Sequence, residues 1–180
     1  MQAQSLSQEA YIRVVYALEF TDREDQLQTS EEVHLYALSY NWDDGDESMH
    51  RLIDHPEIDA GTVLVIYWRA NPQFFCQYAT RDEVPDWARS CYDLIKKIER
   101  RLNEGFYTRR NFHYDPKNDG GVDITQEGRV IDIKQPIPEI MYAATPGVSI
   151  AWGDPYDALS EADWERLNAD IEADDAQEML

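Results

Sequence analysis

Apolar residues recur every three to four positions along much of the chain, which is the spacing of one helical face. The clearest example begins at Pro85, which suits the first position of a helix, and ends at Gly105. Between these two residues the apolar side chains keep a helical period at Trp87, Cys91, Leu94, Ile95, Ile98 and Leu102. The pattern predicts a long helix over 85–104 that buries this face.

Two stretches at the N-terminal end show the same spacing. Ser30 precedes a run over 31–40 whose apolar residues share one face and whose first turn holds two glutamates, which predicts a helix. Residues 5–20 allow two interpretations, because the capping box of Ser5 and Gln8 favours a helix whereas alternating apolar residues from Ile12 to Phe20 also suit a strand. We expect a helix in both stretches.

The middle of the chain predicts two more short helices. The turn residues of 41–46 separate the helix over 31–40 from a short one that should stop before Pro56, since the residue before a proline disfavours helical angles. Asp59 can cap the next helix, although the unbroken apolar run at 63–68 would also suit a buried strand. Short helices spaced this closely suggest antiparallel hairpins of the helical-repeat kind.

The C-terminal half predicts less regular structure. Residues 106–157 are rich in turn residues and are expected to wrap over the helices, with a loop-rich or β-hairpin segment near 120–135. A last helix over 160–174 should bury Trp164 and Leu167. The predicted fold class is therefore mainly α, and the length of 180 residues suggests a single domain over 1–180.

The chain is strongly acidic, with a formal net charge of -20 from 36 acidic and 16 basic residues. Such a charge repels nucleic acid and anionic membrane surfaces and attracts cationic partners at long range. The acidic residues concentrate in 31–57 and again from Asp154 onward, whereas 96–110 carries six basic residues. We therefore expect a basic protein partner, no nucleic acid and no membrane.

The N-terminus and the two cysteines indicate the cellular compartment. The first 15 residues lack the features of a secretory leader and no window approaches the length of an apolar membrane span, so we expect a cytoplasmic protein. Cys76 and Cys91 do not have the spacing of a metal site and are too few for a disulfide framework. Both are expected to be small residues of the core.

Two short motifs resemble a known family. Residues 40–45, "YNWDDG", are followed by His55 and Pro56 and then by Asp59 with "GT" at 61–62, and this pattern over about 30–75 is similar to the bacterial domain of unknown function family 4274. Ile58 departs from the family pattern, in which cysteine is often found there, and this argues against a required thiol. The resemblance implies a helical fold and a bacterial origin, without implying a reaction.

The remaining side chains suggest three kinds of chemistry. The turn at 41–47 offers several oxygen ligands but lacks the spacing of a calcium-binding loop, so we expect no metal and no cofactor. His50, Asp54 and His55 could serve a metal-dependent hydrolase, but no nucleophile accompanies them. The basic stretch 96–114 mixes cations with aromatic residues as RNA-binding surfaces do, yet pairing with acidic neighbours explains it more simply.

The leading hypothesis is a non-enzymatic acidic binding protein, specifically an immunity protein that neutralises a cationic bacterial toxin by direct binding. Small acidic bacterial proteins of this kind are often antitoxins, and complementary charge would raise the rate of encounter. The alternative is a helical-repeat interaction module or adaptor without charge preference. The candidate partner-binding residues are aromatic anchors and the acids around them: Tyr36, Trp42, Asp43, Asp44, Asp46, Glu47, Trp152, Asp154, Tyr156 and Asp157.

Overall fold

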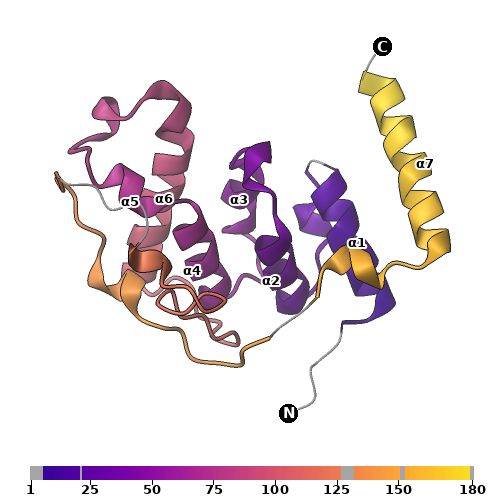
Figure 1. Cartoon of the computed structure of the whole chain (residues 1–180), viewed down its shortest axis with the longest axis horizontal. Helices are drawn as coiled ribbons and strands as arrows, with labels where there is room; N and C mark the ends of the chain where they lie inside the picture. The colour runs from indigo at the N-terminus through magenta and orange to yellow at the C-terminus, as the bar shows by residue number, and fades with distance from the viewer. Residues whose placement is uncertain (1–5, 21, 127–131, 151–152, 179–180) are drawn as a thin grey trace. The chain divides into compact units, whose positions relative to one another are not determined.

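The computed structural model describes residues 6–20, 22–126, 132–150 and 153–178 (Figure 1). These residues form seven α-helices, several short 3₁₀ turns and no strand, so the prediction of a mainly α fold is confirmed. The chain divides into two compact units. Residues 1–40 and 151–180 form one, here called the terminal unit, and residues 41–150 form the other, the central unit. The single domain over 1–180 stays a prediction.

The terminal unit is built around α1 (Gln8–Glu19), which packs against α2 (Ser30–Ser39), α7 (Glu161–Glu178) and the 3₁₀ turn η7 (Pro155–Ala158). The buried side chains of α1 follow a helical period rather than alternating, which explains why this stretch is not a strand. The helix caps differ from the predicted ones. Ser7 caps α1 by accepting the backbone N–H of Ala10, and Thr29 rather than Ser30 caps α2. Ser5, of the predicted capping box, lies outside the described residues.

A buried ion pair joins α1 to α2. The Glu32 side chain is only 1% exposed, and its two oxygens accept from Arg13 at 2.6 Å (Nη2 to Oε1) and 3.1 Å (Nε to Oε2). The backbone N–H of Gln28 donates a third bond to Glu32 Oε2 at 2.8 Å. These three hydrogen bonds replace most of the bonds to water that the Glu32 carboxylate loses on burial. A buried carboxylate is stable when its oxygens are hydrogen-bonded in this way.

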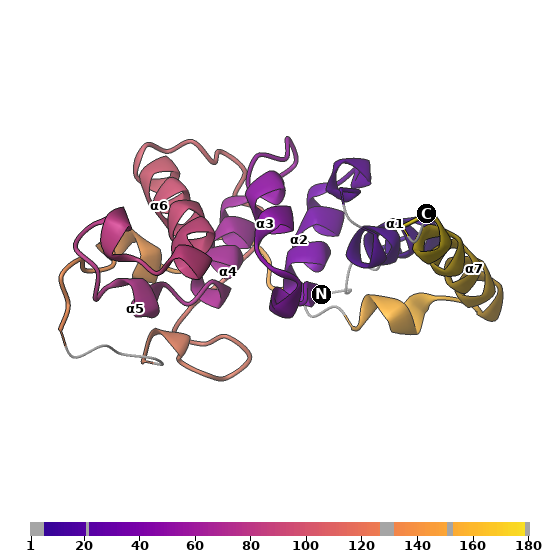
Figure 2. The ribbon, with the colours of Figure 1, turned by 90° about the horizontal axis from the view of Figure 1, so that it is seen from above.

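The central unit holds α3 (Glu47–Leu52), α4 (Ala60–Arg69), α5 (Pro72–Phe75) and α6 (Arg89–Asn103). Helix α4 is buried on all sides from Ala60 to Trp68, so its apolar run is a core helix and not a strand. The amphipathic α6 packs against α3, α4 and α5, an arrangement that Figure 2 shows from above. Its buried residues include Leu94, Ile95 and Ile98, as predicted.

The start of α6 differs from the prediction. Pro85 precedes a 3₁₀ turn, η4 (Asp86–Ala88), and the α-helix begins only at Arg89. Trp87 therefore lies outside the helical phase of α6, and its side chain is 79% exposed instead of buried. The 3₁₀ turn has three residues per turn rather than 3.6, which rotates Trp87 away from the buried face.

Residues 106–150 cross the central unit mainly as loops, as predicted. An antiparallel bridge between Asp119 and Val122 closes a turn in which Gly120 and Gly121 both have positive φ, and the 3₁₀ turn η5 (Ile124–Gln126) follows. The described part of 120–135 contains no strand, so the loop-rich alternative holds there. Residues 127–131 of the predicted segment lie outside the described residues.

Gly61 marks the place where this loop segment meets α4. A Cβ atom at Gly61 would lie 2.4 Å from the carbonyl oxygen of Phe112, a distance that real Cβ atoms essentially never show, and 3.1 Å from Thr145 Oγ1. The first turn of α4 thus admits a second backbone only because position 61 has no side chain.

We expect Gly61→Ala to lower the free energy of unfolding by about 2 kcal/mol, because the clash with backbone outweighs the gain in helix propensity. Urea denaturation of the intact chain measures this change. Gly153→Ala is the matched control, since a Cβ there meets nothing within 4 Å, and it should change stability by less than about 0.5 kcal/mol. Equal stability of the two variants would contradict the close approach at Gly61.

Candidate functional site

The second half of the family-like motif has a structural role. The Asp59 side chain is fully buried, with Oδ1 accepting the backbone N–H of Gly61 at 2.8 Å and Oδ2 accepting that of Asn111 at 2.6 Å. The predicted cap of α4 is thereby confirmed. The same carboxylate also holds a segment 52 residues further along the chain, so Asp59 ties the loops to the helix and is not available for chemistry.

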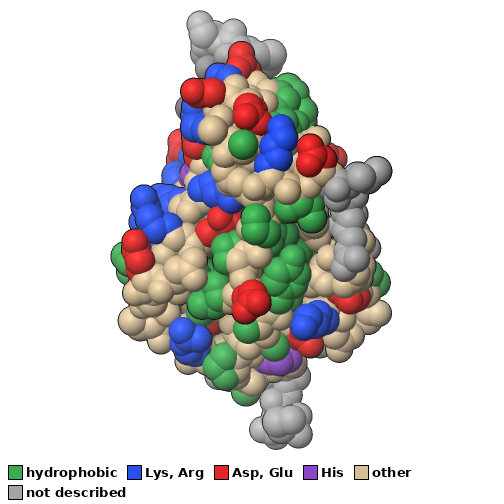
Figure 3. Space-filling view, turned by 90° about the vertical axis from the view of Figure 1, so that its left-hand side faces the viewer, with side chains coloured by type: hydrophobic (Ala, Val, Ile, Leu, Met, Phe, Trp, Pro, Cys, Tyr) green, Lys and Arg blue, Asp and Glu red, His purple; other side chains and the backbone are tan. Residues whose placement is uncertain are grey.

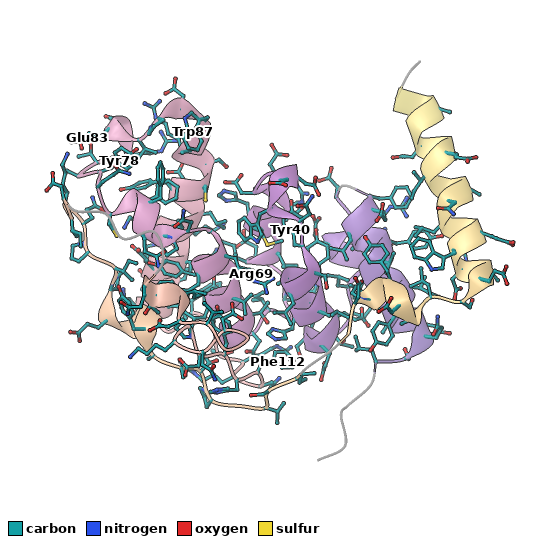
Figure 4. The ribbon with its side chains drawn as sticks, viewed as in Figure 1. Tyr40, Arg69, Tyr78, Glu83, Trp87 and Phe112 are labelled. Carbon is teal, nitrogen blue, oxygen red and sulfur yellow. The ribbon has the colours of Figure 1, made fainter. Side chains whose placement is uncertain are left out.

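Thr145 continues this attachment from the loop side. Its Oγ1 donates to the carbonyl oxygen of Phe112 at 2.9 Å and accepts the backbone N–H of Tyr114 at 2.8 Å. Phe112 and Val148 form an isolated parallel bridge beside it. The loop backbone at 111–114 is therefore bound both to α4 and to 145–148 and forms a fixed support rather than an open site (Figure 4 labels Phe112).

The first half of the motif forms the acidic turn before α3. Asn41 Oδ1 accepts the backbone N–H of Asp43 at 3.2 Å and opens the 3₁₀ turn η2 (Trp42–Asp44). Asn41 has an extended backbone with a φ of -85°, and the turn ends at Gly45, whose positive φ of 95° favours glycine. Asp46 precedes α3 without a capping bond, and its Oδ1 accepts from Ser90 Oγ at 2.8 Å.

This turn presents three candidate partner-binding acids to solvent. Asp43, Asp44 and Glu47 are exposed, whereas Asp46 and Trp42 are half-buried. The predicted acidic surface in this part of the chain therefore consists of Asp43, Asp44 and Glu47, with Asp46 directed to Ser90.

The three residues considered for hydrolysis bind different partners. His50 Nε2 lies 3.1 Å from the carbonyl oxygen and 3.2 Å from the Oγ of Ser90. The ring nitrogen Nδ1 of His55 accepts the backbone N–H of Glu57 at 3.1 Å, so this ring serves a turn. No group of three or more histidine, cysteine or acidic side chains is placed to hold a metal ion anywhere in the described ranges.

The third of these residues, Asp54, joins the basic face of α6. Its carboxylate lies 2.7 Å from Lys97 Nζ and 2.5 Å from Arg101 Nη1. Partial burial alone would raise the pKa of Asp54, but the hydrogen bonds from Lys97 and Arg101 outweigh it and hold this pKa below its ordinary value. Asp54 is therefore an ionised partner of α6 and not a proton-transfer group.

The other basic residues of 96–110 are also largely paired, as predicted. Lys96 binds the buried carboxylate of Glu99, which accepts in turn from the Tyr67 hydroxyl at 2.9 Å, and Arg109 binds Glu57 at 2.6 Å. Burial and the nearby Glu99 raise the pKa of Tyr67. The stretch that resembled an RNA-binding surface thus neutralises part of the first acidic block.

The two thiols show no sign of reactivity. Cys76 is buried, and burial raises the pKa of its thiol above the ordinary value. Cys91 is half-buried, and burial raises its pKa to about 12. A thiol must ionise to act as a nucleophile, so both cysteines are packing residues.

The remaining candidate residues lie in the terminal unit. Tyr36 is 1% exposed and its hydroxyl donates to the buried Glu24 at 3.3 Å, so this ring is not on the surface where an anchor must lie. Tyr156 is half-buried and donates to Glu19. Asp154 caps η7 through the backbone N–H of Tyr156, while Asp157 is exposed. Trp152 lies outside the described residues.

Helix α7 extends the acidic surface beyond the predicted residues. Its 18 residues contain eight acids and one base, and Leu167 is fully buried. Trp164 stacks on Tyr156 with ring centroids 5.8 Å apart and stays 37% exposed, so its predicted burial is wrong. Bonds from Ser160 and Gln8 lower the pKa of Asp163 and keep it ionised. The composition of 154–180 already indicated this helix as a candidate surface.

The net charge is distributed unequally between the two units. The terminal unit holds 17 acidic and three basic residues, for a net charge of -14, and the central unit holds 19 acidic and 13 basic residues, for a net charge of -6. In the terminal unit Arg13 is bound to Glu32, and the guanidinium of Arg23 lies 4.2 Å from the Phe20 ring centroid. The strongest cation-attracting surface is therefore the terminal unit.

Comparison with known proteins agrees with the motif resemblance. Residues 28–103 match the model of a domain of unknown function, DUF4274. No curated protein and no solved structure matches the chain. In the described part of the chain, none of the helices has both the length and the apolar composition that crossing a membrane requires. The resemblance predicted from the motifs at 40–45 and 55–62 is thus confirmed by a match to the DUF4274 family that covers residues 28–103.

Proposed function

We propose that the protein is a non-enzymatic binding protein that recognises a basic protein partner, and that it acts as an immunity protein against a cationic bacterial toxin in the cytoplasm. The observation that carries this proposal is the net charge of -14 on the 70 residues of the terminal unit. A field of this size raises the rate at which a basic protein is encountered, by ten- to a thousandfold at low salt.

The distribution of ion pairs supports an external partner. In the central unit Asp54 and Glu57 are already bound by Lys97, Arg101 and Arg109. On α7, by contrast, Glu165, Glu172 and Asp174 are exposed. Charges that the chain leaves unneutralised contribute little to its own stability but act on any cationic protein that approaches.

The side chains considered for catalysis support the same conclusion. His50, Asp54 and His55 are each engaged with a different group of the central unit. A general acid or base must instead converge with others on one substrate position. The geometry therefore favours recognition over reaction.

The test removes three exposed charges from α7 in one variant, Glu165→Gln, Glu172→Gln and Asp174→Asn. The probe is the most basic protein encoded beside the gene in its native host, and surface plasmon resonance measures its association rate. We expect a 1:1 complex with the unaltered chain and an association rate about tenfold lower for the variant at low salt, since steering depends on local charge. At 0.5 M salt the two rates should converge.

A matched control changes the total charge equally but in the central unit, by Glu104→Gln, Asp132→Asn and Glu139→Gln, all at exposed positions. It should lower the association rate less than the α7 variant does. Absence of a complex would overturn the proposal. A complex whose affinity is the same at low and high salt would instead favour the helical-repeat adaptor.

A further inference from the structure

Three aromatic side chains form a partly exposed surface on the central unit. It consists of Phe74, Tyr78 and Trp87, with the Phe74 ring centroid 5.8 Å from that of Trp87 and 5.7 Å from that of Tyr78. Trp87 is 79% exposed, and the other two rings are half-buried. Figure 4 places Tyr78 and Trp87 on one side of the unit, and Figure 3, which looks onto that side, shows hydrophobic side chains exposed among charged ones.

Local backbone geometry holds these rings outward. Asn71 adopts a left-handed conformation after α4, and Pro72 then begins the four-residue helix α5. Phe75 is buried against Tyr92, with ring centroids 5.9 Å apart, and its half-buried neighbour Phe74 packs edge-on against the Phe75 ring with centroids 5.0 Å apart. The turn η4 directs Trp87 outward from the next segment. Rings fixed in this manner lose little conformational entropy when a partner binds.

The charged groups nearby are bound to each other. Arg89 lies 2.7 Å from Asp86, Arg81 lies 2.7 Å from Asp93, and Lys134 lies 3.3 Å from Glu83. Asp82 is a further exposed acid of the same segment. The neighbouring cations are thus held by carboxylates, and the local balance of charge is slightly negative.

Four other aromatic rings of the described residues have one of the chain's own cations over them, at Tyr16, Phe20, Tyr92 and Phe106. The guanidinium of Arg101 lies 4.5 Å from the centroid of the exposed Phe106 ring, and Arg23 lies 4.2 Å from that of Phe20. Among the described residues, no lysine or arginine lies over the face of the Trp87 ring. An indole face attracts cations more strongly than a phenyl ring does, so the most exposed of these rings is the one left for another molecule.

We propose that the aromatic surface of Phe74, Tyr78 and Trp87 is the docking site for an arginine-bearing segment of the basic partner. This inference rests on the proposed function for the sign of the partner's charge. It adds a short-range anchor to the long-range field of the terminal unit. Arginine fits better than lysine, because its planar guanidinium stacks on aromatic faces and is weakly hydrated. Exposed tryptophan and arginine are also the residues that most often dominate binding energy at interfaces.

The experiment uses a synthetic peptide of alternating arginine and glycine, and the same peptide with citrulline at each arginine position. Citrulline keeps the planar group but lacks its charge. The ¹H–¹⁵N spectrum of the tryptophan indoles of the full chain reports binding, with the Trp87 signal assigned from Trp87→Phe. We expect the arginine peptide to shift the Trp87 signal and to bind about tenfold more weakly to Trp87→Ala, the effect of one good cation–π contact.

Phe106→Ala is the matched control. It also removes an exposed ring, but one that Arg101 already covers, so it should leave the affinity for the arginine peptide unchanged. Trp87→Phe should retain part of the affinity. Because Trp87 is exposed, circular dichroism of Trp87→Ala should match that of the unaltered chain.

The outcomes separate this inference from the proposed function. Equal binding of the arginine peptide to Trp87→Ala and to the unaltered chain overturns the docking site. This holds even where the α7 variant slows association with the basic partner and so supports the proposed function. Weaker binding of the arginine peptide to Trp87→Ala supports the docking site. If the α7 variant at the same time associates with the basic partner as fast as the unaltered chain does, the result counts against the proposed function. Equal affinity for the citrulline peptide, or self-association of the chain through Trp87 without peptide shifts, also overturns it.

Discussion

Replacing Asp59 by alanine is expected to lower the free energy of unfolding by about 4 kcal/mol, because two buried backbone N–H groups then lose a charged acceptor and each costs about 1–3 kcal/mol. These groups belong to Gly61 at the start of α4 and to Asn111 in the loop. Urea denaturation followed by far-ultraviolet circular dichroism gives the change.

Two companion variants make this test specific. Asp59→Asn keeps one acceptor oxygen and should lose about half as much stability. Asp43→Ala removes an exposed acid of the same type, and it should change stability by less than about 0.5 kcal/mol. A loss below about 1 kcal/mol in Asp59→Ala would show that the loop at 109–114 does not depend on this carboxylate.

Replacing Glu32 by alanine is expected to cost about 3 kcal/mol, which is the scale of breaking a buried ion pair by removal of one partner. The variant leaves the Arg13 guanidinium and the backbone N–H of Gln28 without their acceptor. Arg13 is 25% exposed and regains some hydration, so the loss should be smaller than for Asp59. Thermal unfolding monitored by circular dichroism measures it.

The control for Glu32 is an ion pair at the surface. Arg81 and Asp93 have side chains that are 51% and 43% exposed, so Asp93→Ala should cost less than about 1 kcal/mol. A loss in Asp93→Ala as large as that in Glu32→Ala would indicate that burial does not decide the strength of these pairs.

Features set by near neighbours in the chain could be predicted from the sequence. The helical period identified α2 and α6, whereas for α4 it left a buried strand as an alternative, and the Asp59 cap followed from its position before an apolar run. The family motif could also be recognised, because its residues lie close together in the sequence. The net charge similarly indicated α7 as a candidate surface.

Features that depend on the exact helical phase, or on contacts between segments far apart in the chain, could not be predicted in this way. Trp87 fits the helical period of α6 on paper, but a 3₁₀ turn of three residues changes its direction and exposes it. The burial of Tyr36 depends on the fold around it, and its hydrogen bond is to Glu24, 12 residues away in the chain. The second bond of Asp59 reaches Asn111, and no periodicity reports a contact between such distant positions.

The attachment at the start of α4 also bears on where the family segment can be cut. The match to DUF4274 ends at residue 103, whereas Asn111, Phe112 and Thr145 lie after it. Truncation at that limit would leave half of the Asp59 carboxylate unsatisfied and would open the face of α4 at Gly61 to water. The residue at which the family match ends is thus not a position at which this polypeptide can be cut without exposing its core.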